Sequence, residues 1–343
     1  MRKLLVAVVF ALVAGSAFAA VSDRDVLVAP SGTIYTIETT AVNDSQTKVQ
    51  ASYMLALTVQ DGDKTLKTIV PASTLAGVHW RATLAYDSES QTLFVLWLHM
   101  PNAMSSELLL AAYQNGKWQP AVSIDDKPYD LRFNLRIGIT RRVAQLQNDG
   151  TWADIPALVL HAVWWDETGA GEQARYALIS IDKGTVASVD IHDLSEFVDA
   201  SGEPATVDAN FNRELLKHPA ILDGPSANSV DVVFADARTN LFHRVTLRPV
   251  AEARIHIPVG HSGPDTPAFL APESFGAEWS GSVTTISSPR DREKLLFCST
   301  TESGVTYLVH SPNGWSAVKT IPTSSTLSAD AAIAALIKMI SNE

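Results

Sequence analysis

The fold is decided by residues 93–118, which read LFVLWLHMPNAMSSELLLAAYQNGKW. An apolar run from Leu93 to Trp97 is followed by a second run from Leu108 to Tyr113, by the turn Asn115-Gly116 and by Trp118. The same order returns near the C-terminus, as Leu295 to Phe297, Tyr307 to Val309 and Asn313-Gly314-Trp315. A strand–strand–turn unit that recurs along a chain predicts an array of similar β-units.

Five units of this kind fit the chain, each with up to four strand candidates. They span residues 25–70, 82–124, 137–191, 220–259 and 283–321. Val, Ile, Thr and aromatic residues dominate the candidates, as a pleated, half-buried surface favours. In four of the units a short turn sequence with Gly or Asn separates the third strand candidate from the fourth. Gly and Asn tolerate the positive φ of tight hairpin turns. The four turn sequences are Asp61-Gly62-Asp63, Asn115-Gly116, Lys183-Gly184 and Asn313-Gly314.

Four-stranded antiparallel units repeated around an axis are the blades of a propeller. We therefore predict an all-β chain that forms a single β-propeller of five four-stranded blades. A sixth blade stays open if an insertion hides it. The main competing fold is an open β-sandwich, which rarely repeats one four-strand unit with the same turn position.

Two insertions interrupt the repeat. Residues 191–217 hold two short helical candidates, at 194–198 and 209–217, and residues 259–279 are rich in Gly and Pro, which predicts a loop without regular structure. After Ser328, a candidate N-cap, apolar residues follow at helical spacing. This pattern predicts a C-terminal amphipathic helix that packs on the propeller, through Ile333, Leu336, Ile337 and Ile340.

The first 20 residues are typical of a removed signal peptide. Arg2 and Lys3 precede the apolar run from Leu4 to Val13, and Ala17-Phe18-Ala19 is the small-x-small pattern of a cleavage site. The run is too short to cross a bilayer. Cleavage after Ala19 or Ala20 would leave a propeller over residues 21–325 and a helix over 326–343, in a secreted or periplasmic protein whose mature chain has no membrane span.

Charge and cysteine content narrow the classes of partner. The formal net charge of -11 argues against a nucleic-acid backbone or an anionic membrane surface. Cys298 is the only cysteine, so no internal disulfide forms, which suits a bacterial periplasm or exterior. Its apolar neighbours predict a small buried side chain rather than a nucleophile. The His and Asp residues lack metal-ligand spacing, so we predict no metal and no cofactor.

In a propeller, the loops that enter the innermost strands and those that leave the second strands open on one face. Cationic, aromatic and amide side chains occur at the predicted entries, and we expect them to form a ligand-binding cleft at the mouth of the central channel: Arg24, His79, Trp80, Arg81, Asn134, Arg136, His218 and Trp279. Trp faces stack on sugar rings, and an Arg fork binds a carboxylate. The alternative for each residue is a rim ion pair.

The units with a turn Gly and a trailing Trp resemble those of secreted propellers of the sialidase-like and lectin-like kinds. Arg24, Arg81 and Arg136 are similar to the arginine trio with which sialidases hold a substrate carboxylate. The chain lacks a Ser-x-Asp-x-Gly-x-Thr-Trp box, and no Tyr nucleophile with a partner Glu can be assigned. Resemblance to five-bladed glycosidases implies a set of three acids, for which the candidates are Asp25, Asp166 or Asp236, and Glu278.

Three functions stay open at this point. Since no nucleophile–base signature is found, we favour a non-catalytic propeller that binds a glycan, a small ligand or a protein at the channel mouth. One alternative is a glycoside hydrolase of the sialidase-like kind that acts on an anionic glycan, with Asp166, Asp236 or Glu278 in acid–base roles. The other is an envelope assembly scaffold that uses the C-terminal helix as its contact.

Overall fold

The computed structural model describes residues 24–42, 51–102, 105–125, 131–168, 171–193, 198–199, 219–223, 230–236, 241–247, 268–274, 284–287, 295–301, 304–311, 314–324 and 329–342. The predicted signal peptide and the helical candidate at 209–217 lie outside these residues.

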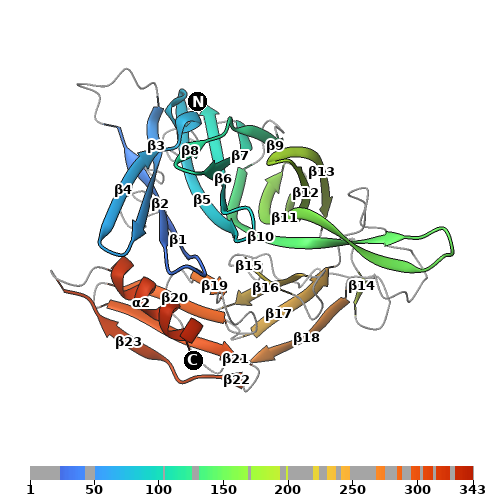
Figure 1. Ribbon diagram of the computed structural model, residues 1–343. Helices are drawn as coiled ribbons and strands as arrows, with labels where there is room; N and C mark the ends of the chain where they lie inside the picture. The colour runs from blue at the N-terminus through green and yellow to red at the C-terminus, as the bar shows by residue number, and fades with distance from the viewer. Residues whose placement is uncertain are drawn as a thin grey trace, which may run out of the picture.

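The strands form five blades around a common axis, which confirms the predicted five-bladed propeller (Figure 1). Blade 1 contains β1 (Arg24–Val28), β2 (Ile34–Ala41), β3 (Ala51–Asp61) and β4 (Lys64–Ile69). Blade 2 contains β5 (Gly77–Asp87), β6 (Thr92–Asn102), β7 (Ser105–Gln114), β8 (Lys117–Trp118) and β9 (Val122–Asp125). The short 3-10 helix η1 (Pro71–Thr74) connects these two blades, whose strands β3 and β5 also pair in parallel.

Blade 3 contains β10 (Leu131–Leu146), β11 (Trp152–Thr168), β12 (Gly171–Asp182) and β13 (Thr185–Asp193). Blade 4 contains β15 (Pro219–Asp223), β16 (Val230–Asp236), β17 (Leu241–Leu247) and β18 (Ala268–Ser274), with the short β14 (Val198–Asp199) beside β18. Blade 5 contains β19 (Thr284–Ser287), β20 (Leu295–Thr301), β21 (Gly304–Ser311), β22 (Gly314–Trp315) and β23 (Lys319–Pro322). The innermost strands β1, β5, β10, β15 and β19 surround the axis (Figure 1).

Blade 4 departs from the sequence prediction. Strand β18 pairs with β17, although it lies in the segment that was expected to be a loop. The strand predicted at 254–259 lies outside the described residues. The sequence does not predict β18 as a strand because it contains Pro272, and Pro is compatible only with an edge strand or a bulge. The structure has such an irregularity, since the β17–β18 register shifts opposite His243. Val198–Asp199 is a strand, not the end of a helix.

The predicted hairpin turns follow from residues that tolerate positive φ. Asn115 and Gly116 have φ of 51° and 76°, and Lys183 and Gly184 have φ of 49° and 81°. Two successive positive φ values give a turn whose twist matches that of the flanking strands. These turns fix the register of the hairpins between β7 and β8 and between β12 and β13.

The core lies in the seams between blades, and β6 shows how it forms. Val95 and Trp97 pack towards blade 1, against residues such as Leu57. Phe94 and Leu96 point to the other side, into a core shared with blade 3. Because both faces of β6 are buried, its sequence is a continuous apolar run rather than an alternating one.

The C-terminal helix α2 (Ala329–Asn342) packs across the seam between blade 5 and blade 1, with its apolar face buried against strands of both (Figure 1). Ile333, Leu336, Ile337 and Ile340 are all buried, as the helical spacing predicted. Each such burial stabilises the fold by about 1.5–3 kcal/mol. This face is therefore not free to serve as the contact that the scaffold hypothesis assumes.

Within the described residues, no helix is both long and apolar enough to cross a membrane.

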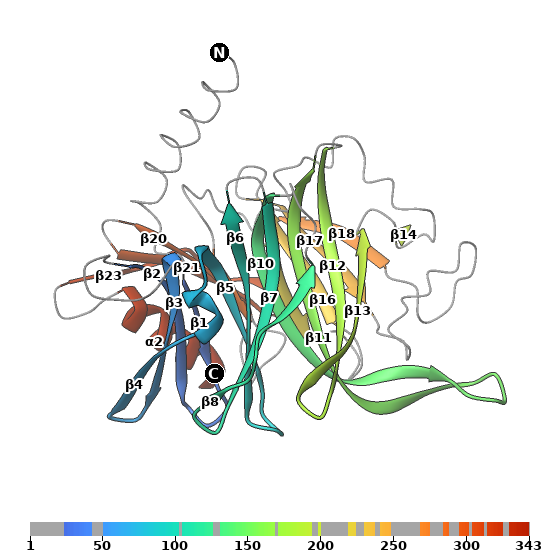
Figure 2. The same cartoon turned by 90° about the horizontal axis from the view of Figure 1, so that it is seen from above.

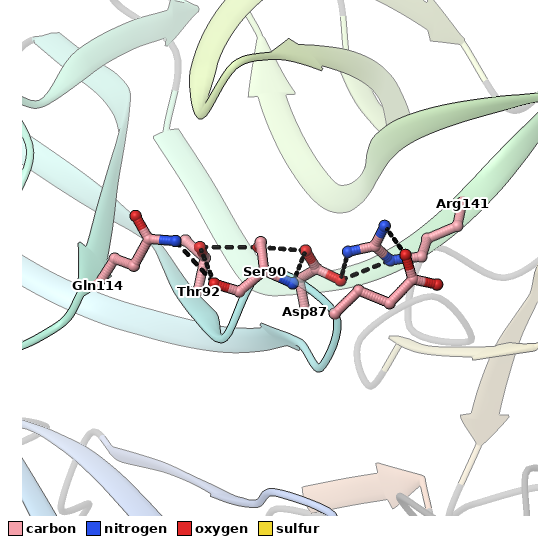
Figure 3. A network of polar contacts seen from close by, with 6 residues as sticks. Asp87, Ser90, Thr92, Gln114 and Arg141 are labelled. Atoms are coloured by element: carbon pink, nitrogen blue, oxygen red, sulfur yellow. Dashed lines mark hydrogen bonds and ion pairs between the residues drawn. The ribbon is translucent and has the colours of Figure 1, made fainter.

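A polar clamp joins blades 2 and 3 (Figure 3). Arg141 of β10 donates from Nε to Oδ1 of Asp87, at the end of β5, over 2.7 Å, and it also pairs with Glu89. The backbone N–H of Ser90 donates to Oδ2 of Asp87 over 3.2 Å, and the carbonyl of Ser90 accepts from Gln114. Burial raises the pKa of Asp87, but the hydrogen bonds from Arg141 and Ser90 outweigh it and hold this pKa below its ordinary value of 3.8.

A pH dependence follows from this clamp. An Asp whose pKa is lowered by folding contributes stability above its unfolded pKa and loses it as the pH falls through the folded pKa. Arg141→Met should therefore lower the free energy of unfolding by about 1–3 kcal/mol at pH 7. Urea unfolding at pH 7 and near pH 3 should show the gap to wild type narrowing in acid; a gap independent of pH would contradict the clamp.

Blades 3 and 4 meet closely at Gly138 of β10. A Cβ atom at this position would lie 2.4 Å from Cγ2 of Ile221 in β15. Gly138→Ala should destabilise the protein by about 1–3 kcal/mol, because a packed seam has no room for the methyl group. Thermal or urea unfolding measures this loss. In an Ile221→Ala background most of the loss should disappear, and an equal loss in both backgrounds would refute the contact.

Candidate functional site

The innermost strand of blade 2 carries a β-bulge. The β5–β6 register runs from Trp80↔Leu98 directly to Thr83↔Leu96, so that Arg81 and Ala82 both lie opposite one residue. Arg81 has a φ of 53°, a strained value for a residue with a side chain, and a bulge of this kind changes where that side chain points. Its guanidinium carbon lies 4.5 Å from the centroid of the Trp80 ring, which also packs against the core between blades 2 and 3. Trp80 thus serves as a platform for Arg81.

A second bulge occurs on the innermost strand of blade 3. The β10–β11 register skips from Phe133↔Trp165 to Arg136↔Val163. Nη1 of Arg136 donates to the carbonyl of Leu135 over 2.7 Å. Its Nε is buried and has no hydrogen-bond partner among the described residues. The bulge therefore holds one nitrogen of this guanidinium while Nε–H lacks an acceptor.

Charged side chains of two other blades lie near enough to Cys298 of blade 5 to act on its thiol. Burial raises the pKa of the Cys298 thiol to about 12, while the charge of Arg136 lowers it and that of Asp25 raises it. Charge effects decline with distance, so all three groups lie in one neighbourhood although they belong to blades 5, 3 and 1. Oδ2 of Asp25 accepts hydrogen bonds from Thr83 Oγ1 over 3.0 Å and from the Leu84 N–H over 2.9 Å. Asp25 thereby ties blade 1 to blade 2.

Two stacked histidines hold the segment that enters β5. The rings of His79 and His99 lie 4.2 Å apart between centroids and are nearly parallel. Nδ1 of His79 accepts from Trp97 Nε1 over 3.1 Å, so Nε2 carries the proton and donates to the carbonyl of Leu75. Burial, with His99 beside it, lowers the pKa of His79 to about 4, and the ring is neutral at physiological pH. His79 has no exposed surface, so its role here is to hold this segment.

His99 extends this arrangement to the next carbonyl. Nε2 of His99 lies 2.9 Å from the carbonyl of Ala76, and Nδ1 lies 2.6 Å from Oε1 of Glu107. Gly77 follows with a φ of 118°, and a Cβ there would lie 2.4 Å from the carbonyl oxygen of Met100. Two imidazoles and one glycine thus fix the backbone immediately before the Arg81 bulge.

Asp166 lies in a buried ion-pair network rather than on a surface. Its carboxylate has no exposure, lies 3.2 Å from Nε of Arg132 and 3.5 Å from Nε of Arg175, and accepts from Trp164 Nε1 over 3.0 Å. Arg132 also pairs with Asp125 of β9 over 3.0 Å. The network joins blades 2 and 3, so the described position of Asp166 is that of a structural carboxylate.

The predicted site residues divide into three groups. Asp25, His79, Trp80, Arg81, Arg136 and Asp166 are described with their side chains as above. The backbones of Arg24, Asn134 and Asp236 lie in β1, β10 and β16, but their side chains are not described. His218, Glu278 and Trp279 lie outside the described residues. No group of three or more potential metal ligands occurs in the part of the chain that the structure covers.

Sequence reasoning did not identify Glu107, Arg132 or Thr83 as partners of these residues. The hairpin register supplies part of the missing signal, since His79 pairs directly with His99, and His99 with Glu107. The bulges are the reason why such a register is hard to derive. Each bulge adds a residue to one strand and changes which side chains share a face.

Comparison with known proteins supports the fold. No family model matches the chain, and no curated protein matches it either. The Hadza microbial sialidase Hz136 has a similar structure, with a TM-score of 0.50 and 12% identity over 88% of this chain; the chain spans 59% of that protein. A protein of unknown function from Dyadobacter fermentans DSM 18053 matches with a TM-score of 0.50 and 11% identity over 89% of this chain and 83% of its own. At these identities the likeness concerns the β-propeller fold alone.

The Asp166 network gives a prediction that separates structure from chemistry. Asp166→Asn should destabilise the protein by about 3–5 kcal/mol, because it leaves the buried Arg132 without half of its countercharge. Urea unfolding measures the change. A matched Asp63→Asn variant, at the exposed turn between β3 and β4, should stay within about 0.5 kcal/mol of wild type. A fully stable Asp166→Asn protein would show that the network is not structural.

Proposed function

We propose that the protein is a non-catalytic β-propeller that binds an anionic ligand, in the first place an acidic glycan, at the mouth of its central channel. Arg136 and Arg81 would contact the anionic group. We further propose that it works in the periplasm or outside the cell, because residues 1–20 have the pattern of a signal peptide.

The main support for this proposal is the edge of the Arg136 guanidinium that is formed by Nε and Nη2. A buried N–H without an acceptor costs about 1–3 kcal/mol. A ligand oxygen that displaces the groups covering Nε of Arg136 removes that cost. The edge formed by Nε and Nη2 matches the two oxygens of a carboxylate, while the bond from Nη1 to Leu135 keeps the guanidinium oriented. An arginine held in this way loses little side-chain entropy when it binds.

Arg81 supports the same ligand class. Its bulge lies on the innermost strand of the adjacent blade, and its stacking on Trp80 orients a second guanidinium. Two cationic groups on neighbouring innermost strands favour an anion over a neutral sugar. The likeness to a protein named a sialidase is compatible with a glycan as the ligand.

The two candidate acids whose side chains are described, Asp25 and Asp166, favour binding over hydrolysis. A general acid or base must reach the substrate. Asp25 accepts hydrogen bonds from Val26, Thr83 and Leu84, and Asp166 is held between Arg132 and Arg175. Both are engaged within the protein, and so neither is poised for proton transfer.

Isothermal titration with 3′-sialyllactose, and with lactose as its neutral match, tests the proposal. We expect binding of the acidic sugar alone, with Arg136→Gln weakening it at least tenfold, about 1.4 kcal/mol. Arg136→Lys should not restore it, since Lys has no fork. Arg142→Gln, at an exposed position of β10, is the control and should bind as wild type does.

Two results would count against this function. Equal affinity for lactose and 3′-sialyllactose, or wild-type affinity of the Arg136→Gln variant, would remove the anion site. Turnover of a chromogenic sialoside or xyloside that single Asp→Asn or Glu→Gln changes abolish would establish the hydrolase instead.

A further inference from the structure

We infer that helix α2 is a latch that closes the ring, and that the seam between blade 5 and blade 1 opens locally when this helix undocks. This inference does not depend on the identity of the ligand. It rests on how the chain closes the propeller and on the residues that fill its last seam.

The order of the strands leaves the first and last blades without a shared sheet. Blade 1 begins the described chain and blade 5 ends its strands, and the two belong to separate sheets. Blades 1 and 2, by contrast, share one sheet through the parallel pairing of β3 with β5. Blades 2 and 3 are joined by the ion pairs of Arg132 and Arg141. The first and last blades therefore need another connection.

Helix α2 supplies that connection. One apolar cluster contains Val26 and Val28 of β1, Leu296 of β20, Val305 of β21 and the buried face of the helix. The helix provides six members of this cluster: Ala332, Ile333, Ala334, Leu336, Ile337 and Ile340. It takes part in no strand pairing, and so it can leave the seam without breaking any strand pair of the blades. An element held mainly by apolar packing is the kind that opens below the threshold of global unfolding.

The seam contains its own reporter. Cys298 is the only cysteine of the protein, and it belongs to the cluster that α2 covers. With 1% exposure, its thiol is closed to reagents while the helix is docked. Reaction of native Cys298 with a maleimide therefore measures how often the seam opens.

The test compares two variants of the full chain that lose the same atoms from different seams. Ile337→Ala weakens the latch, and Ile179→Ala weakens the core between blades 2 and 3; both isoleucines have 0% exposure. We expect Ile337→Ala to accelerate N-ethylmaleimide labelling of Cys298 at least tenfold without added urea, at a rate that low urea concentrations hardly change. Ile179→Ala should leave the labelling rate within about twofold of wild type.

Two outcomes would overturn the latch. Equal acceleration in both variants would mean that Cys298 is exposed only by global unfolding, and an unchanged rate in Ile337→Ala would mean that the helix does not guard the seam. Hydrogen exchange gives a second measurement, because Ile337→Ala should speed exchange of amides in β1 and β20 and leave those in β11 and β12 unchanged. Uniform exchange changes across all four strands would also refute local opening.

Discussion

The blades of this protein are apolar on both faces, and each face needs a neighbouring sheet. In strand β6, successive side chains are buried on opposite faces of the sheet. Val95 and Trp97 are buried towards blade 1, and Phe94 and Leu96 are buried towards blade 3. Sheets of this kind leave no exposed apolar face only if the last blade meets the first. Figure 2 shows that the blades stand side by side around the axis, with α2 beside the strands of blades 1 and 5.

The ring also explains where polar chemistry collects. The strands that surround the axis come from distant parts of the chain, yet the charges of Asp25 in β1 and Arg136 in β10 both reach the thiol of Cys298 in β20. Bulges on β5 and β10 set the positions of Arg81 and Arg136, and neighbouring groups hold each bulge in place. Polar clamps such as Arg141 with Asp87 fix the angle between adjacent blades (Figure 3). Rigid surroundings of this kind orient a binding side chain before any ligand arrives.

The sequence reveals those features whose cause is local. The turn at Asn115-Gly116 is predictable because its backbone needs positive φ, and α2 is predictable because its apolar spacing is helical. Strand β18 is not, since Pro272 and the surrounding Gly and Pro residues favour a loop until β17 is present to pair with it. The sequence alone makes Asp166 a candidate catalytic acid. Its burial between Arg132 and Arg175 depends on contacts within and between blades, and the sequence of a single strand does not reveal these contacts.

The pKa of the Cys298 thiol is the most direct test of the ring. Selective ¹³C labelling of cysteine gives a single signal, whose titration can be followed by NMR. We predict a midpoint near 12, which Asp25→Asn lowers and Arg136→Gln raises, because these charges reach the thiol from blades 1 and 3. A midpoint near the ordinary value of 9.0 that neither substitution changes would contradict a closed ring that buries Cys298 within reach of both charges.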